Sequence, residues 1–194
     1  MKKSNLHSTV AVGFMAALVF VSNYIQFVIP TPIGTTRIHI ANGICLLAAL
    51  LLGGLRGGIA AGLGSFLFDL TIPDYAATSW VTLIMKFLLV FICGLVVYGR
   101  KKYSDDSKVF VWRRILGTVA GSLFYILLFI LRQYIEQYLI FKVSFETVTA
   151  ITFVTKLPVS LVNAAIAVIL SILLHSAIRP ALKKSGLADK MKVF

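Results

Sequence analysis

The sequence predicts an all-α integral membrane protein, a bundle of six transmembrane helices with both termini in the cytoplasm. Of its 194 residues, 59% are hydrophobic and 13% are charged, about half the charged share of a soluble domain. The mean hydropathy is +0.93. The formal net charge of +12 would also suit a nucleic-acid-binding protein, but the basic residues lie between long apolar runs. That arrangement is typical of membrane proteins and excludes both a soluble domain and a nucleic-acid partner.

The chain forms a single domain, residues 1–194, in which six apolar segments are candidate membrane spans. Their approximate bounds are residues 9–29, 38–52, 57–72, 79–98, 115–135 and 152–178. The second and third are shorter than the roughly 20 residues that a full crossing needs. Pro30, Pro73 and Pro180 end the first, third and sixth, because proline cannot continue a helix. Pro158 lies inside the sixth, where we expect a kink.

The distribution of Lys and Arg predicts the orientation. If the N-terminus is cytoplasmic, the outer loops hold only Arg37 and Lys142, and the positive-inside bias then favours both ends inside. The segment from Lys101 to Arg114 becomes a cytoplasmic loop. The basic residues expected on the inner side are Lys2, Lys3, Arg56, Arg100, Lys101, Lys102, Lys108, Arg113, Arg114, Arg179, Lys183, Lys184, Lys190 and Lys192.

Small residues at helical spacing predict where helices pack closely, because lipid supplies little force between apolar helices. Residues 58–62 and 117–121 each carry a Gly-x-x-x-Gly motif, which indicates packing inside the bundle. The first segment carries the pair Gly13 and Ala17. Since this is the terminal helix, its small face is a candidate contact for another protein.

The polar residues within the spans cluster toward the predicted outer side, and the inner halves hold almost none. A charged group inside a membrane costs several kcal/mol unless it is paired or hydrated, so each one needs a reason. A channel or proton relay would place such groups through the full depth. The pattern therefore predicts a cup that opens outward, is closed below by apolar packing and binds a small molecule. The candidate binding residues are His39, Asn42, Tyr75, Trp80, Lys86, Arg132, Lys156 and Asn163.

Lys86 and Asn163 lie deepest among these candidates. A lysine can donate to a ring oxygen, a hydroxyl or an anionic group, and asparagine both donates and accepts. Tyr75 and Trp80 are suited to stacking on a flat ring. Two helical stripes place the polar groups on one face each: Ser79, Thr82 and Lys86 in the fourth segment, and Thr152, Lys156, Ser160 and Asn163 in the sixth.

Purely structural roles compete with these assignments. Tyr75 and Trp80 also fit an interfacial aromatic belt. Arg132 and Glu136, four residues apart, fit an ion pair on one helix. Asp69 is suited to pairing with Lys86 or to capping the turn that follows it. Lys156 is also suited to snorkelling to the outer surface. Ser79 and Thr82 are suited to bonding to their own helix backbone.

The motifs of several enzyme classes are missing from the sequence. It contains no P-loop, no H-E-x-x-H and no C-x-x-C, which excludes a familiar ATPase or metal site and leaves this chain without a predicted cofactor. It also shows no obvious inverted repeat of the kind common in secondary transporters. We therefore expect a capture subunit that takes its energy from a partner. The alternatives are a stand-alone ion-coupled or facilitative carrier using His39, Asp69 and Lys86, and an intramembrane enzyme using Ser65.

Several stretches resemble the substrate-binding S components of energy-coupling factor (ECF) vitamin transporters. The resemblance covers most of the chain and is strongest between residues 37 and 94. It is carried by residues 37–47, 53–58, 60–65, 69–76 and 80–86, which read RIHIANGICLL, GGLRGG, AAGLGS, DLTIPDYA and WVTLIMK.

The resemblance implies a six-helix protein of the bacterial cell membrane with an outward vitamin pocket. It implies as partners a transmembrane coupling subunit of the EcfT type and two cytoplasmic ATPases of the EcfA type, which would bind the ATP. In the family, an alanine-x-x-x-alanine face on the first helix meets the coupling subunit, and Gly13 and Ala17 stand at the nearest match here. Among S components, the chain looks most like the group assigned to hydroxymethylpyrimidine or pyridoxine. The mechanism implied is a toppling of the S component within the membrane.

Overall fold

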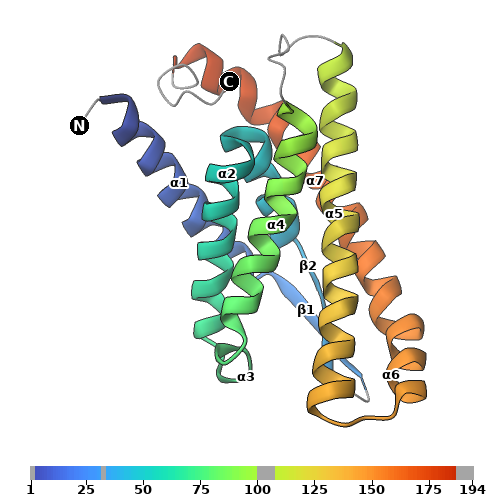
Figure 1. The fold of residues 1–194 in the computed structure, drawn as a ribbon. Helices are drawn as coiled ribbons and strands as arrows, with labels where there is room; N and C mark the ends of the chain where they lie inside the picture. Colours follow the sequence, from blue (N-terminus) through green and yellow to red (C-terminus); the bar gives the residue numbers. More distant parts are fainter. Residues whose placement is uncertain (1–2, 32–33, 100–107, 187–194) are drawn as a thin grey trace.

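The computed structural model describes residues 3–31, 34–99 and 108–186 as a helical bundle with one β-hairpin (Figure 1). The elements are α1 (Lys3–Ser22), β1 (Gln26–Thr31), β2 (Gly34–His39), α2 (Ala41–Leu70), α3 (Pro73–Ala76), α4 (Ser79–Tyr98), α5 (Lys108–Tyr134), the π-helix η1 (Ile135–Ile140), α6 (Phe145–Ile151), the π-helix η2 (Thr152–Lys156) and α7 (Leu157–Lys184).

The helical, membrane-spanning character predicted from composition is confirmed. Within the described ranges, four helical stretches are long and apolar enough to cross a membrane, and α1 contributes a shorter apolar helix, Leu6–Ser22. The four are Ala41–Leu70, Ser79–Tyr98, Phe110–Ile140 and Phe145–Leu182. The number of six crossings stays a prediction.

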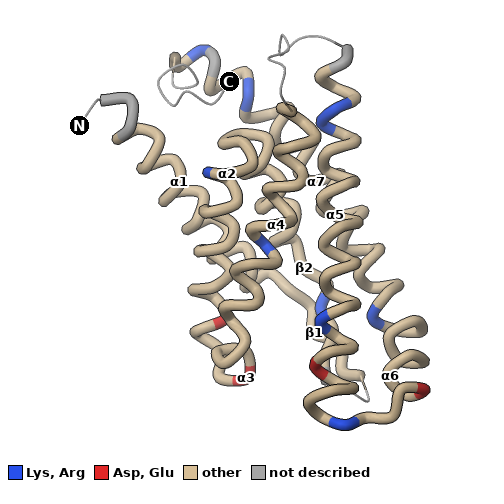
Figure 2. The backbone as a smooth tube through the Cα atoms, viewed as in Figure 1, with Lys and Arg blue, Asp and Glu red and all other residues tan. Residues whose placement is uncertain are grey.

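The carboxylates and the cations are distributed differently along the bundle. In the described part of the chain, Asp and Glu gather at the end that carries α3 and α6, which we call the α3 end, whereas Lys and Arg occur at both ends (Figure 2). The cytoplasmic placement of the termini stays a prediction. Six residues used for it lie outside the described ranges: Lys2, Arg100, Lys101, Lys102, Lys190 and Lys192.

Helix α2 folds back on itself at Gly53. This residue has φ 77° and ψ 176°, a backbone conformation that glycine adopts without steric cost. A Cβ on Gly57 would lie 2.5 Å from the backbone oxygen of Ala48, although a straight helix from residue 48 to residue 57 would separate the two by about 13 Å. The chain therefore reverses where the second and third predicted segments meet.

The hairpin β1–β2 corrects the bounds of two predicted spans. Residues 23–29 and 38–39, expected to be helical, belong to the turn after α1 and to two antiparallel strands that pair Phe27 with Ile38 and Val28 with Arg37. Residues 27–29 of β1 are apolar, so composition alone predicts that they extend the first helix. β1 is a strand because it pairs with β2, and β2 is in turn bonded to α7.

Close contacts between backbones hold the centre of the bundle together. A Cβ on Gly94 of α4 would overlap the Cα of Gly54, and one on Gly121 of α5 would lie 2.7 Å from the backbone oxygen of Leu89. The packing role predicted for residues 58–62 and 117–121 is confirmed. A Cβ built on any of the four glycines of these two motifs would lie 3.0 Å or less from an atom of α4. By contrast, Gly13 has nothing within 4 Å of its Cβ position.

The half of the bundle away from the α3 end contains a buried polar pair that the sequence did not predict. Helix α5 begins at Lys108, so Arg114, expected in a loop, lies inside a helix and is 8% exposed. Its Nη1 donates to Nδ1 of the fully buried His175 over 2.8 Å. Since arginine has no acceptor, Nδ1 must be unprotonated, which fixes the His175 ring as the neutral Nε2–H tautomer.

Replacing His175 with leucine is expected to lower the melting temperature. The change removes the acceptor of a charged donor, and such hydrogen bonds contribute about 1.5–3 kcal/mol. His175→Gln, which restores an acceptor, should lose less. Thermal unfolding of the purified variants in detergent measures the difference, and equal melting temperatures for wild type and both variants would contradict the role given to this pair.

The last helix also differs from its predicted bounds of 152–178. It continues past Pro180 to Lys184, because a proline near a helix end removes only one of many backbone hydrogen bonds. At its other end it is preceded by α6 and by the wider turn η2, which ends two residues before Pro158. The kink expected at Pro158 stays a prediction.

Candidate functional site

A cavity of about 370 Å³ lies in the α3 half of the bundle, between the hairpin, α2, α4, α5 and α7. None of its lining residues belongs to the opposite half, where apolar side chains such as Leu46, Leu50, Val97 and Phe110 form the core. The structure brings together seven of the eight predicted site residues on its wall: His39, Asn42, Tyr75, Lys86, Arg132, Lys156 and Asn163.

The eighth candidate, Trp80, lies outside the cavity and its side chain is 60% exposed. It is the second residue of α4, whose polar face instead points Thr82 and Lys86 toward the cavity. Ser79 is buried and bonds to the backbone oxygen of Ala76 over 2.8 Å. Trp80 therefore fits the aromatic belt, and Ser79 bonds to the backbone of α3 instead of that of its own helix.

Lys86 lines the cavity and is 3% exposed. Its Nζ donates to Oδ1 of Asn42, at the start of α2. The same Nζ lies 4.9 Å from the ring centroid of Tyr125, a cation–π contact with α5. The alternative pairing of Lys86 with Asp69 does not occur among the described residues.

Asn163 connects α7 to the hairpin. Its Nδ2 donates to the backbone oxygen of Arg37 over 2.6 Å, and its Oδ1 accepts from the backbone nitrogen of His39 over 3.0 Å. Both ends of the amide are thus engaged by β2, with one N–H and one lone pair to spare. The structure places Asn163 on the cavity wall as predicted, but its bonds identify it first as the anchor of the hairpin.

On its other side the hairpin contacts α3 through an aromatic ring. The guanidinium carbon of Arg37 lies 4.1 Å from the centroid of the Tyr75 ring, and the Tyr75 hydroxyl is 3.2 Å from Oγ1 of Thr35. Arg37 also donates to Oε1 of Gln26 across the hairpin over 3.0 Å. One face of Tyr75, predicted to stack on a ligand, is therefore covered by a cation of the protein itself.

His39 lies in β2 beside these cations. Burial, together with the positive charges of Lys86 and Arg37, lowers the pKa of His39 well below its ordinary value. The ring is therefore neutral at neutral pH, and one nitrogen is available as an acceptor.

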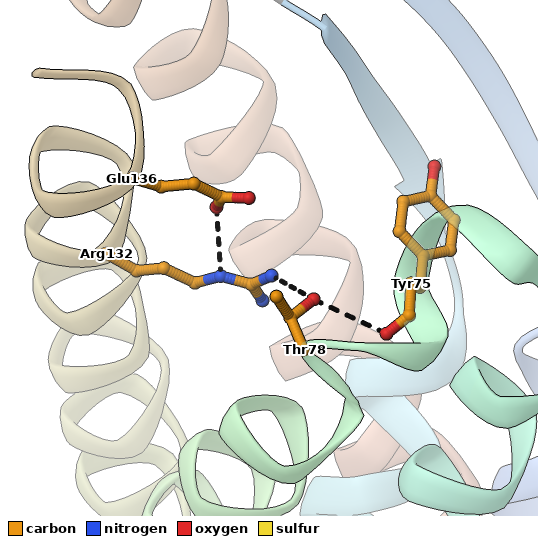
Figure 3. Close-up of polar contacts among 4 residues, drawn as sticks. All are labelled: Tyr75, Thr78, Arg132 and Glu136. Carbon is orange, nitrogen blue, oxygen red and sulfur yellow. Dashed lines mark hydrogen bonds and ion pairs between the residues drawn. The ribbon is translucent and has the colours of Figure 1, made fainter. Parts of the chain in front are cut away.

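Four residues join α5 and η1 to α3 and the turn that follows it, and Figure 3 shows them bridging these elements. Arg132 Nε lies 3.3 Å from Oε2 of Glu136, which confirms the predicted ion pair. Arg132 Nη2 donates to Oγ1 of Thr78 over 2.9 Å, and Thr78 Oγ1 donates to the backbone oxygen of Tyr75 over 3.4 Å. We call this chain, Tyr75–Thr78–Arg132–Glu136, the latch.

Lys156 is 3% exposed and lines the cavity, so the snorkelling alternative is wrong. Ser160 and Asn163 share its face, as the predicted stripe requires. Thr152, the fourth member of that stripe, is buried outside the cavity. The cause is η2, since a π-helical turn takes more residues than an α-helical one and so rotates Thr152 off the common face.

Helix α5 contributes a wall of the cavity that is largely missing from the predicted site. Ser122, Tyr125, Phe129 and Gln133 follow at steps of three and four and all line the cavity. That spacing is a signal for one helix face. Because these side chains are uncharged, the signal is weaker than that of a lysine or arginine inside a span.

Comparison with known proteins identifies the fold and the family. A family model described as "ECF-type riboflavin transporter, S component" matches residues 3–180. A solved structure described as "Structure and mechanism of the S component of a bacterial ECF transporter" has 20% sequence identity and a TM-score of 0.59, covering 91% of this chain and 97% of that one. No match was found among curated proteins.

At 20% identity the solved structure supports the fold, whereas the family follows from the match over most of the chain. Such subunits bind a substrate for transport and are not enzymes, in agreement with a cavity confined to one half of a membrane-spanning bundle. The chain belongs to the ECF-type S-component family.

Proposed function

We propose that this chain captures a water-soluble vitamin at the outer face of a bacterial membrane and that riboflavin is its substrate. The observation that carries the proposal is the cavity that gathers the predicted polar residues at the α3 end of the bundle. The name of the matching family supports riboflavin. Hydroxymethylpyrimidine and pyridoxine, favoured by the sequence resemblance, are the competing substrates.

The length of the cavity favours the larger vitamin. Along α5 its wall extends from Ser122 to Gln133, a stretch of α-helix that spans about 16 Å. A tricyclic ring with a tail fills such a slot, whereas hydroxymethylpyrimidine and pyridoxine each contain one small ring.

Titration of the purified protein with riboflavin, hydroxymethylpyrimidine and pyridoxine tests the proposal. Riboflavin fluorescence should be quenched on binding, and calorimetry should rank riboflavin as the tightest ligand. Tighter binding of hydroxymethylpyrimidine or pyridoxine would overturn the substrate, and no binding by any B vitamin or precursor would overturn the capture function.

We further propose that the chain works with an EcfT-type coupling subunit and two EcfA-type ATPases, with both of its termini in the cytoplasm. The face of α1 around Gly13 and Ala17 is proposed as the coupling contact, and the open space at Gly13 supports this. Copurification with these subunits, and its loss in Gly13→Trp, would test the contact.

The competing function is that of a stand-alone carrier. Riboflavin uptake into liposomes that contain this chain alone would indicate that function.

Replacing Thr78 with valine is expected to speed both association and dissociation of riboflavin. The variant removes the hydroxyl that accepts from Arg132 and so opens the latch, while Arg132 keeps its ion pair with Glu136. The hydrogen bond that is lost has a charged donor, Arg132, and a neutral acceptor. Its loss is expected to raise both rates about tenfold. Stopped-flow fluorescence measures both rates. Unchanged rates in Thr78→Val would show that the latch does not control access.

A further inference from the structure

The cavity contains buried polar atoms that have no partner within the described protein. They are Oγ of Ser122, Nδ1 of His39 and Nε2 of Gln133, and all three residues line the cavity. Ser122 is only 5% exposed. Buried polar groups in folded proteins are nearly always hydrogen-bonded, so these atoms point to a ligand that bonds to them.

Lys86 adds a positive charge near Ser122, since Gly121 of α5 packs on Leu89 of α4, three residues after Lys86. An ammonium has three donors, of which one is used by Asn42, while the ring of Tyr125 lies 4.9 Å from Nζ. Among the described residues, no carboxylate lies within ion-pair distance of Lys86. The cavity is lined by four cations, Arg37, Lys86, Arg132 and Lys156, and by three carboxylates, Asp69, Asp74 and Glu136.

The three carboxylates lie nearer the α3 end than Lys86 does. Gly58 and Gly62 of α2 face Phe87 and Leu83 of α4, which places Lys86 level with this part of α2. Asp69 follows Gly62 by two helical turns and therefore lies about 10 Å closer to the α3 end. The positive charge of Lys86 is thus separated from the Asp69 carboxylate along the bundle.

Between Ser122 and the latch, the wall of α5 is aromatic. Tyr125 and Phe129 lie on the cavity face between Ser122 and Gln133. The lining therefore changes along its length from donors, through two rings, to the charged groups of the latch. A flat molecule with an oxygen at its leading end matches that order.

We propose that Lys86 and Ser122 together hold an oxygen acceptor at the deep end of the substrate, whose flat ring lies against Tyr125 and Phe129. The inference rests on the proposed function. In riboflavin this oxygen is either a ring carbonyl or a hydroxyl of the tail. Lumichrome, which keeps the ring carbonyls and lacks the tail, distinguishes the two sources.

The first test compares Lys86→Met with wild type by titration with riboflavin and lumichrome. Loss of a hydrogen bond from a charged donor is expected to weaken binding roughly 10- to 100-fold. Weakening for both ligands assigns the oxygen to the ring, and weakening for riboflavin alone assigns it to the tail. Lys184→Met, on the exposed last turn of α7, controls for the loss of one charge and should bind as wild type does.

The second test uses Ser122→Ala and does not depend on the folding of the lysine variant. Because Ser122 Oγ has no partner within the described protein, its removal should leave the melting temperature of the free protein unchanged while riboflavin binding weakens about tenfold. Ser171→Ala is the matched control, since Ser171 is fully buried, bonds to the backbone oxygen of Val168 and lies outside the cavity.

Riboflavin binding by wild type that persists within about threefold in both Lys86→Met and Ser122→Ala would overturn the inference and leave the proposed function standing. If wild type binds hydroxymethylpyrimidine or pyridoxine instead, the same variants are titrated with that ligand, and an unchanged affinity again overturns it. Failure of wild type to bind any of these vitamins would overturn both proposals.

Discussion

Asn163→Ala is expected to weaken vitamin binding about 30-fold and to loosen the hairpin. The variant removes two hydrogen bonds, one to the backbone oxygen of Arg37 and one from the backbone nitrogen of His39. Each bond contributes about 1 kcal/mol to holding the hairpin in place. Without them, part of the binding free energy is used to order the hairpin, and a loss of about 2 kcal/mol corresponds to 30-fold in affinity.

Two measurements separate this role from direct contact with the ligand. Amide hydrogen exchange in β2 should accelerate in the free variant, because the His39 N–H has lost its acceptor. Thr155→Val, also on the sixth predicted segment, loses only a bond to its own helix at Ile151 and lies outside the cavity, so it should change neither quantity. Weakened binding with unaltered exchange in β2 would show that Asn163 acts on the ligand and not through the hairpin.

Gly94→Ala is expected to cause a large loss of stability. Its Cβ would overlap both the Cα and the nitrogen of Gly54. Both neighbours are backbone atoms, so the clash is relieved only by separating α2 from α4. Overpacking of a core costs about 1–3 kcal/mol, and more where the backbone must move.

Thermal unfolding in detergent measures the effect, with Gly13→Ala as the control. Gly13 is also helical but has open space around its Cβ position, and alanine exceeds glycine in helix propensity by about 1 kcal/mol. We expect the control to unfold at or above the wild-type temperature. If Gly94→Ala matches it, the seam between α2 and α4 is not as close as described.

The residues whose burial is costly were the ones that could be located best from the sequence. Lys86 and Lys156 stand out because a cation inside a span needs a polar environment, and both line the cavity. The fourth segment, residues 79–98, coincides with α4 because a proline-containing turn precedes it and a glycine follows it. Local chemistry determines these features, so local reasoning finds them.

Features that depend on distant partners were not predictable in the same way. Residues 27–29 are as apolar as a span, and only the pairing of their strand with β2 distinguishes them from a helix. Asn163 reads as a ligand residue until its bonds to His39 and Arg37, 124 and 126 residues away, are known. Ser122 and Gln133 are neutral and cost less to bury than a charge, so they are harder to recognise as part of a site.

The contact between Gly54 and Gly94 gives the two sides of the cavity unequal freedom to adapt. One side is a seam of touching backbones, which cannot shift without disturbing the whole bundle. The other side, formed by the hairpin and the far part of α5, is tethered by individual side chains such as Asn163 and Arg132. Evolution toward a new nutrient is therefore easiest on the tethered side, where substitutions reshape the recess and the supporting scaffold is left intact.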